Sequence, residues 1–103
     1  MGRWSQTRRS GGGVSTPLVI THALRGLDDE LEVQFSGNVV AAWFDLADFT
    51  TNVTLQNPTS ITLVGANALL LSFAAIITTD VTLTYAGNAP NVASPQTVTI
   101  EDS

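Results

Sequence analysis

From residue 18 to the C-terminus, apolar and polar residues alternate along the chain, which is the pattern of β-strands with one buried face. In the clearest case, Val81, Leu83 and Tyr85 alternate with two threonines. Threonine and valine, which favour pleated surfaces, are frequent throughout this part. The segments that we expect to form strands are 18–24, 30–35, 53–55, 61–64, 69–73, 81–85 and 97–101.

Turn-forming residues separate these segments at intervals of roughly ten residues. Gly65-Ala66-Asn67 joins two of the segments, which we therefore expect to form a hairpin. Strict alternation disfavours a parallel sheet, whose strands are apolar on both faces. The pattern predicts an all-β fold, an antiparallel β-sandwich of about seven strands, with a jelly roll or a small barrel as the alternative.

Two segments depart from the alternation. Val39–Phe44 is apolar almost throughout, so we expect a further strand that is buried on both faces or meets a partner. Its Trp43 is expected to pack in the core, with a subunit contact as the alternative. A single helical turn is expected at 45–49, where Asp45 is a suitable cap.

The first 17 residues differ in composition from the rest. They contain three arginines, a run of three glycines and no acid, whereas residues 18–103 contain one arginine against nine acids. The net charge of −5 is thus the balance of a +3 segment and a −8 body. We expect residues 1–17 to be a flexible basic arm, because such a segment buries too little apolar surface to fold alone. Residues 18–103 are expected to form one domain.

The arm has the chemistry of a docking segment. Trp4, Arg8 and Arg9 are of the residue types that most often anchor interfaces, and we predict that they bind a partner. A disordered tail or a cloning remnant is the alternative. The acidic body disfavours nucleic acid, so an acidic neighbour, including another copy of this chain, is the better match for the arginines.

Four segments of the body resemble strands of one known domain family. In this order and spacing they are similar to the bacterial immunoglobulin-like domain, which occurs as repeats in adhesins and as single modules in phage virion proteins. The resemblance covers residues 18–103 approximately. The four segments are 31–36 (L-x-V-x-F-S), 48–50 (D-F-T), 67–73 (N-x-L-x-L-x-F) and 81–85 (V-T-L-T-Y).

The resemblance implies an immunoglobulin-like sandwich and a structural, non-enzymatic role. A single copy with an arginine-rich arm and no signal peptide fits a free-standing virion component better than an adhesin repeat. We therefore expect a phage capsid decoration (cement) protein, an oligomer on the capsid surface that binds the major capsid protein or neighbouring copies of itself. The alternative is an extracellular adhesion or carbohydrate-binding module, or a module of a tail or fibre.

The sequence offers little for catalysis. His22 is the only histidine, and the alternation places it on the apolar face of the first expected strand, between Ile20 and Leu24. We interpret it as a core or edge residue, because no local signature of a nucleophile accompanies it. We expect no enzymatic activity and no cofactor.

The acidic residues fit turns and helix caps better than they fit a metal site. Asp45 and Asp48 belong to the expected helical turn, and Asp28-Asp29-Glu30 to a turn between strands, although calcium at the latter stays an open alternative. The chain has no cysteine, which excludes disulfides and thiolate sites. Its longest apolar stretch, 68–77, is too short to span a membrane, so we expect neither a metal nor a membrane partner.

Overall fold

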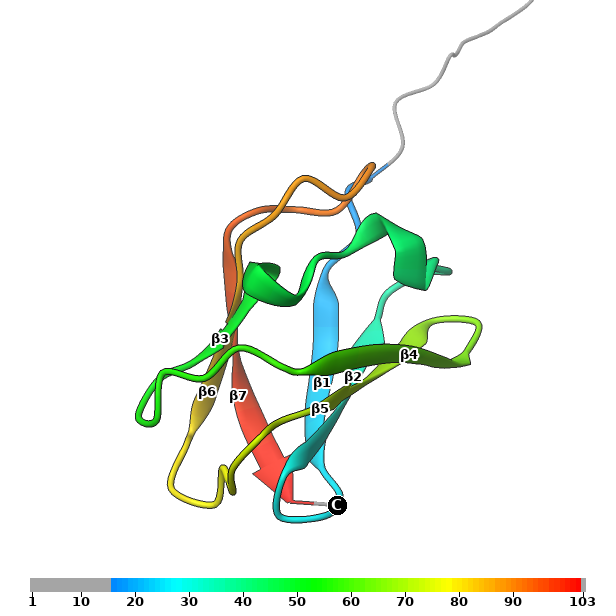
Figure 1. Cartoon of the computed structure of the whole chain (residues 1–103). Helices are drawn as coiled ribbons and strands as arrows, with labels where there is room; N and C mark the ends of the chain where they lie inside the picture. The colour runs from blue at the N-terminus through cyan, green and yellow to red at the C-terminus, as the bar shows by residue number, and fades with distance from the viewer. Residues whose placement is uncertain (1–15, 103) are drawn as a thin grey trace, which may run out of the picture.

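The computed structural model describes residues 16–102, which form an all-β body with two single-turn 3-10 helices (Figure 1). The prediction of an all-β fold is confirmed. The predicted anchors Trp4, Arg8 and Arg9 lie outside the described residues. In chain order the elements are β1 (Ile20–Arg25), β2 (Glu30–Phe35), η2 (Ala41–Trp43), η3 (Leu46–Asp48), β3 (Phe49–Thr51), β4 (Ser60–Gly65), β5 (Ala68–Ser72), β6 (Thr82–Tyr85) and β7 (Gln96–Asp102).

The described strands pair in the order β3-β6-β7-β1-β2-β5-β4 and form a sheet that curls around the core (Figure 1). Every neighbouring pair is antiparallel except β1 and β7, which run parallel with Ala23 opposite Ile100. The sheet is therefore mixed and not wholly antiparallel as expected. Alternation disfavours a sheet that is parallel throughout, but it does not exclude a single parallel pair within a mixed sheet, which is why this pair was missed.

The core lies inside the curl and is built from alternate residues of the strands. In β2, Leu31, Val33 and Phe35 are buried and the residues between them are half-buried, as the alternation predicts. Neighbouring rings of an aromatic cluster lie with centroids 5.3–5.7 Å apart, a spacing at which ring contacts add to the stabilisation by burial. The cluster consists of Phe35, Phe44, Phe49 and Tyr85.

The burial pattern of β1 differs from the prediction because the strand contains an irregularity. Its register against β2 shifts between Ile20 and His22, which moves the buried face from the even-numbered positions to Ala23. Ile20 and Ala23 are buried, whereas His22 is exposed and its Nδ1 lies 3.5 Å from the Glu101 carboxylate. The expectation that His22 sits on an apolar face was therefore wrong. A bulge of this kind reverses the side-chain direction of every residue beyond it.

The apolar run Val39–Phe44 does not form the expected strand. Local hydrogen bonds, from Trp43 N–H to the Val40 carbonyl and from Phe44 N–H to the Ala41 carbonyl, close η2 instead. Trp43 is half-buried and packs against the core. The run carries the chain from β2 to β3, so its apolar residues cover one end of the core and have no neighbouring strand to pair with. The single turn at η3 agrees with the prediction, and Asp45 occupies its N-cap position.

Gly87 follows β6 at a point where a side chain has no room. A Cβ atom at this position would lie 2.6 Å from the Asp48 carboxyl group and 2.8 Å from the Tyr85 hydroxyl. Both groups are held in place, because the Asp48 carboxylate accepts the Asp45 N–H at 2.9 Å and the Tyr85 hydroxyl accepts the Ala89 N–H at 3.0 Å. The aromatic cluster and the η3 turn are thus packed against bare backbone.

We predict that Gly87→Ala lowers the free energy of unfolding by about 1–3 kcal/mol, the usual cost of inserting a methyl group into a filled site. Urea denaturation measures the loss. Gly26→Ala is the matched control, since nothing lies within 4 Å of its added Cβ. Equal losses in the two variants would contradict the packing described for Gly87.

Candidate functional site

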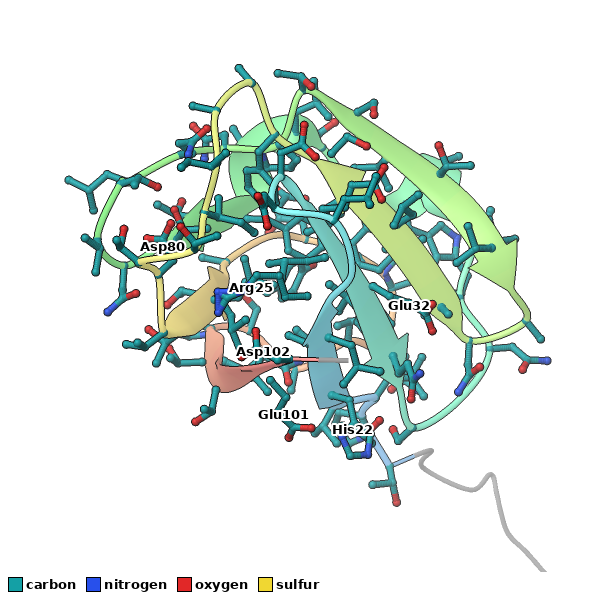
Figure 2. The ribbon with its side chains drawn as sticks, turned by 90° about the horizontal axis from the view of Figure 1, so that it is seen from below. His22, Arg25, Glu32, Asp80, Glu101 and Asp102 are labelled. Carbon is teal, nitrogen blue, oxygen red and sulfur yellow. The ribbon has the colours of Figure 1, made fainter. Side chains whose placement is uncertain are left out.

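The carboxylate of Asp80 is completely buried and holds the β3–β4 loop (Figure 2). It accepts hydrogen bonds from the backbone N–H groups of Val53 and Thr54, at 2.7 and 2.8 Å, and from the Thr54 hydroxyl at 2.7 Å. A buried carboxylate is tolerated only when its oxygens are occupied by donors of this kind. The loop is therefore fixed to the segment that precedes β6.

Burial alone would raise the pKa of Asp80, because it disfavours the charged form. The hydrogen bonds that the carboxylate accepts from Thr54, Val53 and Thr51 act in the opposite direction and outweigh it, so the pKa lies below the ordinary value for an aspartate. The group is ionised in the folded protein at neutral pH, and its charge is part of the fold.

Further side-chain hydrogen bonds fasten the same two loops together. The Asn52 side-chain oxygen accepts the N–H groups of Val81 and Thr82, at 2.9 and 3.1 Å. Both polar atoms of the Gln56 side chain bond to the backbone of the β5–β6 loop. Its Oε1 accepts the Ala75 N–H at 3.1 Å, and its Nε2 donates to the Ala75 carbonyl at 3.3 Å. The β3–β4 and β5–β6 loops are thus joined at several points along their length.

The β1–β2 turn and the end of β1 are fastened to the β5–β6 loop by backbone and side-chain contacts. The Ile77 N–H donates to the Asp28 carbonyl, and the Phe73 N–H to the Asp29 carbonyl, both at 2.8 Å. The Arg25 guanidinium donates to the carbonyls of Ile77 and Asp80 at 3.1 and 3.2 Å. We call the three connections together, residues 26–29, 52–59 and 73–81, the loop end of the body.

The most exposed large apolar side chains of the described chain gather at the loop end. Five of its large apolar side chains are 53–70% exposed, and these are the five highest values for such residues among residues 16–102. Apolar surface that is concentrated at one place on a protein marks an interaction site more often than scattered apolar residues do. The five residues are Leu27, Val53, Leu55, Ile76 and Val81.

Leu55 adds a second observation that points to an interaction site. Its backbone adopts φ 54°, in the left-handed region that a leucine rarely occupies, while its side chain is the most exposed of the five. Strain of this kind persists where the surrounding structure holds it in place, and it gathers at functional positions. Here the Asp80 carboxylate holds the two preceding N–H groups, and Leu55 is presented to solvent.

Acidic groups lie beside these apolar side chains. The turn contributes Asp28 and Asp29, β2 begins with Glu30, and β7 ends at Asp102, which accepts a hydrogen bond from the Arg25 guanidinium at 3.2 Å. Arg25 is the only arginine of the described part of the chain, so the loop end carries a net negative charge. It is apolar and acidic together.

The structure separates the other residues that the sequence analysis singled out. His22 lies on the outer side of β1 beside Glu101, and Asp45 and Asp48 occupy the η3 turn. Asp28 and Asp29 lie in a turn, as expected, and no group of three or more potential metal ligands occurs among residues 16–102. The same residues enclose no pocket and form no helix long and apolar enough to cross a membrane.

The residues that build the loop end were not found by sequence reasoning. The segment 53–55 was expected to be a strand, but its N–H groups bind the Asp80 carboxylate and are not available to a neighbouring strand. Asp80, directly before the expected strand 81–85, was not singled out in the sequence analysis. A buried aspartate in a loop before a strand has no sequence signature that separates it from an exposed turn aspartate.

We predict that Asp80→Asn lowers the free energy of unfolding at neutral pH by about 2–3 kcal/mol, because the amide cannot accept the bonds of a charged carboxylate. The folded-state pKa lies below the unfolded value of about 3.9, so this stabilisation is complete above that pH and is lost as the pH falls through the folded-state pKa. Urea denaturation as a function of pH measures both effects.

Asp28→Asn is the control for Asp80→Asn, since Asp28 is exposed and the substitution is expected to change the stability by less than about 0.5 kcal/mol. A constant difference in stability between the wild-type chain and Asp80→Asn from neutral pH to strongly acidic pH would contradict the role given to the Asp80 charge.

We predict that Leu55→Asn raises the free energy of unfolding by about 1 kcal/mol, because asparagine tolerates the left-handed conformation and the lost side chain makes few contacts. Thermal and urea denaturation measure the gain. Leu27→Asn, also at an exposed position of the loop end but without positive φ, is expected to gain nothing. A loss of stability in Leu55→Asn would show that the leucine side chain is needed for folding.

Comparisons with known proteins give a likeness of fold only. No family model matches the chain, and no curated protein matches it. The structure of the N-terminal part of the bacterial S-layer protein SbsC superposes with a TM-score of 0.65 at 12% sequence identity, over 82% of this chain and 24% of the other. Domains 1–6 of the surface layer protein SbsC give 0.66 at 12% identity, over 87% and 14%. The chain thus spans a quarter or less of the proteins whose fold it shares.

Proposed function

We propose that this chain is a structural module of a repeated protein surface, and that it serves as a decoration protein of a phage capsid. The observation that carries the proposal is the loop end, where five exposed apolar side chains are held on a rigid network around Asp80. A rigid apolar surface of this kind is suited to a protein–protein contact, because little conformational entropy is lost when it binds. Many such contacts, repeated by symmetry, would stabilise a shell by avidity.

The strand order supports an immunoglobulin-like sandwich as the finer description of the fold. Numbered A to G in chain order, the strands would give one sheet A-B-E-D, from β1-β2-β5-β4, and a second sheet G-F-C, from β7-β6-β3. The parallel pair of β1 and β7 would then be the junction of first and last strands between the two sheets. This order agrees with the resemblance of segments 31–36, 48–50, 67–73 and 81–85 to that family.

An extracellular surface layer is the second candidate location. The two structural neighbours are surface-layer proteins, and this likeness supports a place on a cell surface as the alternative to a virion. At either location the chain would make repeated contacts with its neighbours, either side by side or end to end. An adhesion module that binds carbohydrate is a further alternative.

A direct test is immunogold electron microscopy with antibodies against the purified chain, applied to phage particles and to cell envelopes of the source culture. We expect gold at regular spacing on virions, and sedimentation of the chain with intact particles. Labelling confined to cell envelopes would move the assignment to a surface layer. Recovery of the chain only as a freely diffusing species would contradict a structural role at either location.

A further inference from the structure

The N-terminal segment enters the body at the end opposite the loop end (Figure 1). Leu18 N–H donates to the Asn91 carbonyl at 2.8 Å, and Ala93 N–H donates to the Leu18 carbonyl at 2.9 Å. These bonds hold the start of the described chain beside the β6–β7 connection. We call residues 16–18 and the β6–β7 connection, residues 86–95, the arm end. From there β1 runs six residues, a length of about 20 Å, to the turn that belongs to the loop end.

The two ends of the molecule carry complementary chemistry. Residues 1–15, which join the arm end, contain Trp4 and three arginines without any acid. The loop end presents five exposed apolar side chains beside the acids Asp28, Asp29, Glu30 and Asp102. Tryptophan and arginine are the side chains that best occupy a surface that is apolar and acidic together.

The direction of the chain favours a second copy as the partner. Leu18 pairs in parallel with Val92, so residues 16–18 continue the line of β1 away from the loop end. Thr16 precedes Pro17, a position at which the backbone is extended and not helical. The described chain therefore starts at the end of the body opposite its own loop end, and this placement favours the loop end of a second copy as the partner.

We propose that the loop end of one copy binds residues 1–15 of a second copy, so that the chains associate head to tail. This inference rests on the proposed function, for which it names the contact between neighbouring modules. In this contact the apolar side chains of the loop end are the binding surface for Trp4, and the acids beside them are the binding surface for the arginines. Because the two surfaces are different, the contact is heterologous and extends to an open chain or closes to a ring.

Charge disfavours the symmetric alternative, in which two loop ends face each other. Such a dimer would bring Asp28, Asp29 and Glu30 of each copy next to those of the other, and like charges in contact oppose association. The exposed edge strand β4 is another surface on which copies can pair, since Ser60–Gly65 contains no charged residue. It lacks the acids that would attract an arginine-rich segment, and it serves below as the control.

The test uses two full-length variants that are each blocked at one end. In the first, Leu55→Lys with Asp28→Lys makes the loop end polar and basic while residues 1–15 stay intact. In the second, Arg3→Glu, Arg8→Glu and Arg9→Glu reverse the N-terminal charge while the loop end stays intact. Sedimentation velocity then gives the oligomeric state of the wild-type chain, of each variant and of their mixture, at about 0.05 and about 0.5 M salt.

We expect the wild-type chain to form oligomers whose size grows with concentration and falls at the higher salt. Each variant alone is expected to associate at least about tenfold more weakly than the wild-type chain, a change typical of losing interface anchors. The mixture should form a 1:1 heterodimer and nothing larger, because one free loop end meets one free N-terminal segment. Circular dichroism confirms that both variants are folded. Val64→Lys, on the exposed edge strand, is the matched control and should associate like the wild-type chain.

Several results would overturn the inference. A chain that is monomeric at every concentration shows that copies do not bind each other this way, and the loop end then binds either its own N-terminal segment or another protein. Loss of association in Val64→Lys alone shows that copies pair along β4. A mixture without a heterodimer excludes a head-to-tail contact. None of these results affects the immunogold test, so the proposed function and this contact fail separately.

Discussion

The loop end depends on the charge of one buried group. A carboxylate that is removed from water is stable only when its oxygens accept hydrogen bonds. For Asp80 the donors are Val53 and Thr54, which lie 27 and 26 residues earlier in the chain. The polar backbone of that loop therefore turns inward, and its apolar side chains are left on the outside. This arrangement reverses the usual one, in which apolar side chains turn inward and the polar backbone faces water. It produces a surface that is apolar and rigid at once.

Local patterns could be predicted from the sequence, whereas features that depend on contacts between distant residues, such as those of Asp80, could not. The alternation in β2 and β6 is a local property, so Phe35 and its neighbours were placed correctly on the buried face. Segment 53–55 alternates equally well, but the distant carboxylate of Asp80 takes the N–H groups that a strand would need. The exposure of His22 follows from a register shift against β2, which no single strand encodes. The strain at Leu55 was invisible because leucine gives no sign of a left-handed conformation, as glycine or asparagine would.

The molecule has two unlike ends. At the arm end the described chain starts beside the β6–β7 connection, and an arginine-rich segment precedes it in the sequence. At the loop end the surface is apolar and acidic. The net charge of the chain conceals this polarity, because it averages a basic segment and a strongly acidic body. A module with two unlike, complementary ends is suited to a repeated assembly, since each copy offers its neighbour the surface that the neighbour needs. That polarity supports the proposal that the chain belongs to a repeated protein surface.

The central claim is that the Asp80 carboxylate holds the apolar loop in a rigid conformation before any partner binds. Amide hydrogen exchange of the full chain at low concentration, followed by nuclear magnetic resonance, tests it most directly. The account predicts that the amides of Val53 and Thr54 exchange as slowly as those of the buried strand β2, because their hydrogens are held by the carboxylate. Exchange of these two amides at the rate of an open loop would show that the Asp80 carboxylate does not hold the loop in place, which would contradict the account of the loop end.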